Sequence, residues 1–94
     1  MPQTEEFEVV LVSGGDDAGY SVFVPALPGC ASEGEDRDEA LYMVQGAIEL
    51  FLEEVGRPAM EETEDAEQMK KDWTTQGYTV QTASVLVNLN AGIN

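Results

Sequence analysis

The stretch that most constrains the fold is residues 20–55, in which an alternating pattern of apolar residues changes to a helical one. Alternate residues of the segment 20–24 are apolar on one face, which predicts a strand. Pro25 ends this strand, because proline cannot donate a hydrogen bond to a neighbouring strand. Apolar residues then recur at helical spacing and predict a helix over residues 37–55. These apolar residues are Ala40, Leu41, Val44, Ala47, Ile48, Phe51, Leu52 and Val55.

A tight turn is predicted directly after this strand. Pro28 pre-sets the backbone angle at the second position of a type II turn, and Gly29 accepts the positive angle that the third position needs. Asp36 is then a predicted helix cap, with Glu39 placed to complete a capping box. The residues assigned to the structural turn are Pro25, Leu27, Pro28, Gly29 and Cys30.

Weaker patterns account for the rest of the chain. Residues 7–12 are apolar on both faces, which predicts a strand that is covered on both sides. Residues 30–33 predict a short, polar edge strand. In residues 62–75 acids come first and lysines last, the polarity that suits a second, shorter helix. Residues 81–89 alternate again and predict the last strand.

These elements predict an α+β fold of the type β-β-β-α-(α)-β. We expect a single domain over residues 1–94, with a helical insertion at 57–79. A right-handed crossover would place the last strand parallel to the first, in the spatial order 3-2-1-4. Since one helix covers one face of the sheet, the other apolar face predicts at least a homodimer, unless the segment 62–75 covers it. Gly46, beside the core-facing Ala47, is expected to let the long helix approach the sheet closely.

The charge of the chain restricts its partners. Nineteen acidic residues against four basic ones give a net charge of −15. Such a surface repels the phosphates of nucleic acids and attracts basic proteins. Adaptation to a saline cytoplasm would produce the same composition, and the sequence does not separate the two explanations.

Residues that could carry chemistry are few. The chain has no histidine, so Cys30 lacks a base and is interpreted as a small buried residue. Asp16 and Asp17 lie in a glycine-rich loop and are interpreted as a solvated turn rather than a metal site. The first strand offers a nuclease site only Glu8. We therefore expect no enzymatic activity, no cofactor and no metal. The N-terminus lacks the pattern of a signal peptide, and a cytoplasmic location is expected.

The block from the second strand to the long helix resembles the HicB-like antitoxin family. The resemblance implies a partial ribonuclease H-like sheet and the sequestering of a small basic ribonuclease toxin, similar to HicA, by covering its RNA-binding surface and catalytic histidine. Such antitoxins usually add a DNA-binding domain, and none is expected after the last strand here. Departures from the family pattern are Ala26, Asp36 and the pair Gln45-Gly46. The matching positions are Tyr20, Phe23, Pro25, Leu27, Pro28, Gly29, Cys30, Gly34, Glu39, Ala40, Ala47 and Ile48.

Four acids between the third strand and the long helix are the candidate partner-binding residues: Glu33, Glu35, Asp36 and Asp38. Their alternative role is to cap and solvate the helix. Two functions remain open at this point. One is an antitoxin-like binding protein without enzymatic activity, and the other is a solitary homo-oligomeric protein of the same family without a toxin partner.

Overall fold

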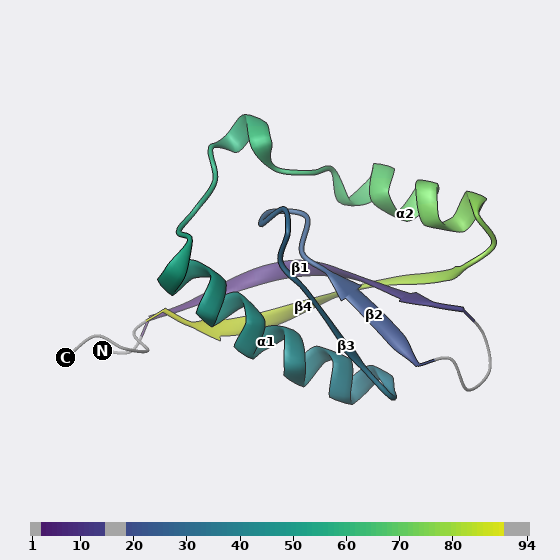
Figure 1. Ribbon diagram of the computed structural model, residues 1–94, viewed down its shortest axis with the longest axis horizontal. Coiled ribbons are helices and arrows are strands. Elements are labelled where there is room, and N and C mark those ends of the chain that lie inside the picture. The colour runs from purple at the N-terminus through teal and green to yellow at the C-terminus, as the bar shows by residue number, and fades with distance from the viewer. Residues whose placement is uncertain (1–2, 15–18, 90–94) are drawn as a thin grey trace.

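A computed structural model describes residues 3–14 and 19–89 as a four-stranded antiparallel sheet with helices packed against it (Figure 1). The strands lie in the order β3-β2-β1-β4, as the sequence predicts. The predicted loop aspartates, Asp16 and Asp17, lie outside the described residues. The elements are β1 (Thr4–Ser13), β2 (Tyr20–Phe23), β3 (Ala31–Gly34), α1 (Arg37–Glu54), a 3-10 turn η1 (Met60–Glu62), α2 (Ala66–Thr75) and β4 (Thr79–Asn88).

The direction of β4 corrects the sequence prediction. β4 pairs with β1 in antiparallel register, with Phe7 opposite Val85 and Val12 opposite Val80, and not in parallel. The reason is that two helices, α1 and α2, connect β3 to β4. Along α1 the chain runs back beside the sheet, and along α2 it returns in the opposite direction, so that β4 starts near the end of β1 (Figure 1). A parallel β4 would require a connection with one helix along the sheet rather than two.

The main core lies between α1 and one face of the sheet. Val9, Leu11 and Val22 are fully buried there, and Ile48 of α1 is buried against them. Leu41 and Leu52, which the helical pattern also directs at the sheet, are partly buried and pack against this core. The buried residues of the core are Phe7, Val9, Leu11, Val22, Val24, Leu27, Cys30, Ala40, Val44, Ile48, Val85 and Val87.

The second face of the sheet is covered by α2. Val10 and Val12 point to this face and are 0% and 5% exposed, and α2 packs against β1 and β4 here. Trp73 of α2 stacks on Phe23 of β2, with ring centroids 5.4 Å apart. This is the alternative that the sequence left open, so burial of these two valines does not require a second copy of the chain. The homodimer itself stays a prediction.

The predicted type II turn is present between β2 and β3. The Cys30 amide donates to the Leu27 carbonyl at 2.9 Å, and Gly29 has a φ of +94°. Leu27, the first residue of this turn, and Pro25, which precedes it, are both buried. The turn therefore fixes how the short edge strand β3 returns along β2.

The expectation for Gly46 is wrong, because this residue is exposed and a Cβ added to it would meet no atom within 4 Å. The glycine that permits a close approach is Gly34, at the end of β3. A Cβ on Gly34 would lie 2.4 Å from the backbone nitrogen of Ala40, so only glycine fits where β3 meets the first turn of α1.

Candidate functional site

The four candidate acids lie where β3 ends and α1 begins, and all four are exposed. We call Glu33, Glu35, Asp36 and Asp38 the acidic corner. The close approach of β3 to the first turn of α1 at Gly34 places the four acids around one bend of the chain. At the sheet edge, their side chains are exposed to solvent.

Asp36 has the structural role that the sequence predicts. Its Oδ1 accepts a hydrogen bond from the Glu39 amide at 2.8 Å, which caps α1. Glu39 reaches back to the Glu35 amide, whose nitrogen lies 2.6 Å from Glu39 Oε1. The two side chains therefore satisfy amides at the helix start. The carboxylates of Glu33, Glu35 and Asp38 are left for other contacts.

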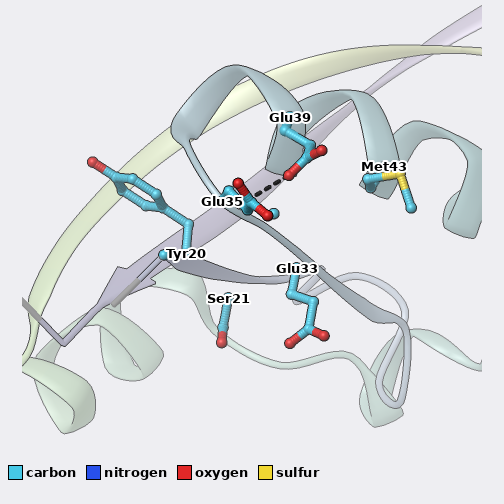
Figure 2. Close-up of a pocket in the computed structure, with 8 residues that line it drawn as sticks. Tyr20, Ser21, Glu33, Glu35, Glu39 and Met43 are labelled. Carbon is cyan, nitrogen blue, oxygen red and sulfur yellow. Dashed lines mark hydrogen bonds between the residues drawn. The ribbon is translucent and has the colours of Figure 1, made fainter. Parts of the chain in front are cut away.

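Glu33 of the corner and Glu39 of α1 lie on opposite sides of β3 (Figure 2). Ser21 pairs with Glu33 across β2 and β3, and Figure 2 shows both directed to the opposite side of the strand from Glu39. Ser21, Glu33 and Glu39 line an open hollow of about 720 Å³, together with Tyr20 and Met43. This hollow is thus an open depression at the sheet edge, with acidic side chains on both sides of β3 (Figure 2), rather than a closed pocket.

Sequence reasoning missed an exposed apolar surface beside this corner. Tyr42, Met43 and Leu50 of α1 are 73%, 47% and 55% exposed, and we call them the outer face of α1. A shallow groove of about 510 Å³ runs along them past Gly46. The row Tyr42, Gly46, Leu50 at four-residue spacing is the signal in the sequence that could have revealed this surface.

Two of the four basic residues are engaged within the chain. Arg57 forms an ion pair with Glu5 and lies over the ring of Phe7, its guanidinium carbon 5.8 Å from the ring centroid. Arg37 Nε donates to Gln81 Oε1 at 3.1 Å. Lys70 and Lys71 are exposed on α2. None of these residues neutralises the acids of the corner through an ion pair within the described residues.

The described part of the chain offers few groups for metal binding or nucleophilic chemistry. Residues 3–14 and 19–89 contain no group of three or more histidine, cysteine or acidic side chains that could hold a metal ion. Burial raises the pKa of the Cys30 thiol, so that Cys30 is a poor nucleophile. Within the same ranges, every helix is too short or too polar to cross a membrane.

Relatives among curated proteins match less than half of the chain. A UPF0150 protein of Helicobacter pylori is 51% identical over 37 residues, which cover 39% of this chain and 51% of that protein. A UPF0150 protein of Thermoplasma acidophilum is 41% identical over 44 residues, covering 47% of this chain and 64% of that protein. The matches thus span between half and two thirds of these relatives.

Solved structures extend the likeness to the fold. The antitoxin HicB of Burkholderia pseudomallei matches with a TM-score of 0.53 and 29% identity, over 86% of this chain and 63% of that one. The crystal structure of its N-terminal domain matches with a TM-score of 0.51 and 28% identity, over 86% of this chain and 98% of that domain. The family model described as HicB_like antitoxin of bacterial toxin-antitoxin system matches residues 7–91. This chain therefore belongs to the HicB-like antitoxin family.

Proposed function

We propose that this chain sequesters a small basic ribonuclease toxin, similar to HicA, through the acidic corner and the adjoining outer face of α1. The observation that carries the proposal is the contiguity of these two surfaces, since Met43 borders the same hollow as Glu33 and Glu35. Membership in an antitoxin family supports a toxin as the partner.

The two surfaces would have different roles in binding. Carboxylates at an exposed edge attract a basic protein and raise the rate of encounter more than the affinity. Exposed apolar side chains such as Tyr42 and Leu50 provide the area from which water is expelled in the complex. Inhibition would then be steric, because the bound antitoxin covers the toxin surface that contacts RNA.

The proposal is tested by measuring the affinity of a basic protein encoded beside this chain, at several salt concentrations. The informative variant is Glu33→Gln/Glu35→Gln, which leaves the Asp36 cap intact. A matched control is Glu53→Gln/Glu54→Gln, which removes the same charge at the other end of α1. We expect the first variant to weaken binding about tenfold and to reduce the salt dependence, and the control to change both much less.

Equal effects of the two variants would exclude the acidic corner as the contact. A lysate pull-down that recovers no basic partner would contradict the toxin itself. Self-association of the purified chain in that case would favour the solitary homo-oligomer instead.

A further inference from the structure

A groove on the second face of the sheet, between α2 and the end of β2, combines aromatic and acidic side chains. Its volume is about 560 Å³. Phe23, Met69 and Trp73 supply the apolar part of its lining, and Glu64, Asp65 and Asp72 supply the acidic part. We call this hollow the α2 groove. None of the acidic-corner residues lines it.

The aromatic side of the groove is held in place from both ends. Trp73 stacks on Phe23 at an interplanar angle of 18°, and Tyr78 meets Trp73 edge-on, with centroids 5.2 Å apart and planes at 82°. A backbone hydrogen bond also anchors Glu64 of the groove, because its amide donates to the Pro25 carbonyl at 2.8 Å. The wall is therefore formed before any ligand arrives, and ordering it costs little on binding.

The carboxylates have capacity left for a cation. Asp72 Oδ1 accepts from Gln68 Nε2 at 2.8 Å, and Asp65 Oδ1 accepts from the Glu67 amide at 2.9 Å, so each has a second oxygen. Among the described residues, no arginine or lysine lines the groove. Across residues 3–14 and 19–89 the one ion pair joins Arg57 to Glu5, and the two lysines of α2 do not line the groove.

We propose that the α2 groove binds the guanidinium group of an arginine in a basic polypeptide. An aromatic wall attracts a cation through the quadrupole of its rings, and a neighbouring carboxylate pairs with it. A planar guanidinium satisfies both at once, by lying against the rings while its fork of donors reaches a carboxylate, whereas an ammonium does so less well. Charge complementarity selects this occupant over a second, equally acidic copy of the chain. The inference does not depend on the partner being a toxin.

The test uses the emission of Trp73, which is the single tryptophan of the chain. The probes are three short glycine-flanked peptides with two arginines, two lysines or two citrullines, the last being a neutral isostere of arginine. We expect the arginine peptide to change the emission saturably, and both other peptides to bind at least several-fold more weakly. Asp72→Asn should weaken arginine binding about tenfold, the loss expected for a charge-assisted hydrogen bond. Glu53→Gln, a matched charge removal on α1, should leave it unchanged.

A second variant separates the ring from the charge. Phe23→Leu keeps an apolar side chain and removes the aromatic wall partner, so it should reduce arginine binding while circular dichroism confirms the fold. Equal binding of the citrulline or the lysine peptide would overturn the proposal. Equal weakening of arginine binding by Asp72→Asn and Glu53→Gln would also overturn it, because the peptide would then be attracted by the overall charge of the protein alone.

Discussion

At the residue scale, the backbone requires glycine at position 29 but not at position 46. Gly29 occupies a left-handed backbone conformation, although a Cβ there would meet only the ring of Phe51 at 4.0 Å. Gly46 lies in the middle of α1 with open space around it. The positive backbone angle of Gly29 can be predicted from the sequence, because Pro28 precedes it in a type II turn pattern. The open space around Gly46 cannot be predicted in this way, because a helical pattern does not indicate which residues pack against the outer side of the helix.

The same substitution at these two glycines should therefore have effects of opposite sign. Gly29→Ala should destabilise the protein by about 1–2 kcal/mol, through left-handed strain alone. Gly46→Ala should stabilise it by up to about 1 kcal/mol, because alanine is the better helix former. Chemical denaturation of both variants measures the two free energies. A stabilised Gly29→Ala would exclude the type II turn.

Cys30 gives a second prediction at this scale. Its thiol is buried, and burial raises its pKa, so little thiolate is present at neutral pH. In the native protein the thiol should react with a maleimide far more slowly than in denaturant. Because the pKa is raised in the folded state, the stabilising contribution of the neutral thiol is complete below the unfolded pKa and is lost as the pH rises through the folded one. Rapid labelling of the native protein would contradict this burial.

At the scale of elements, sequence patterns predict the strands and helices but not their directions. The alternating and helical patterns identify β1, β2, β4 and α1, because each of these presents a regular apolar face to the core. The polar residues of β3 and the charge order of α2 identify these two elements instead. Whether β4 runs parallel to β1 depends on the direction in which α2 crosses the sheet. The residues of segment 62–75 predict a helix but not this direction. The apolar outer face of α1 is not predicted for a related reason, since the regular helical pattern marks only the side of the helix that faces the sheet.

The packing of α1 predicts a clear ranking of substitutions. Ile48→Ala should cost about 2–5 kcal/mol, because Ile48 is fully buried in the main core. Tyr42→Ala, on the outer face of α1, should stay within about 0.5 kcal/mol. Denaturant midpoints compare the two variants directly, and the reverse ranking would mean that the helix packs through another face.

The whole molecule combines strong negative charge with an exposed apolar surface. Val10 and Val12 are already covered within the chain, so a homodimer would have to use surface such as the outer face of α1. Two chains that each carry a charge of −15 repel one another, and salt screens this repulsion. Self-association measured by sedimentation should therefore strengthen as salt rises. A dimer that dissociates on adding salt would contradict this reasoning.

The opposite dependence is predicted for a basic toxin, and its inhibition is the most direct test of the proposed function. The measurement is a titration of the toxin's ribonuclease activity with the purified protein, at about 0.1 M and about 1 M salt, where the Debye length falls from about 10 Å to about 3 Å. We predict that activity is abolished near a stoichiometric ratio at the lower salt, and that inhibition sets in more slowly at the higher salt. Full ribonuclease activity in the presence of excess protein at the lower salt would contradict the antitoxin function.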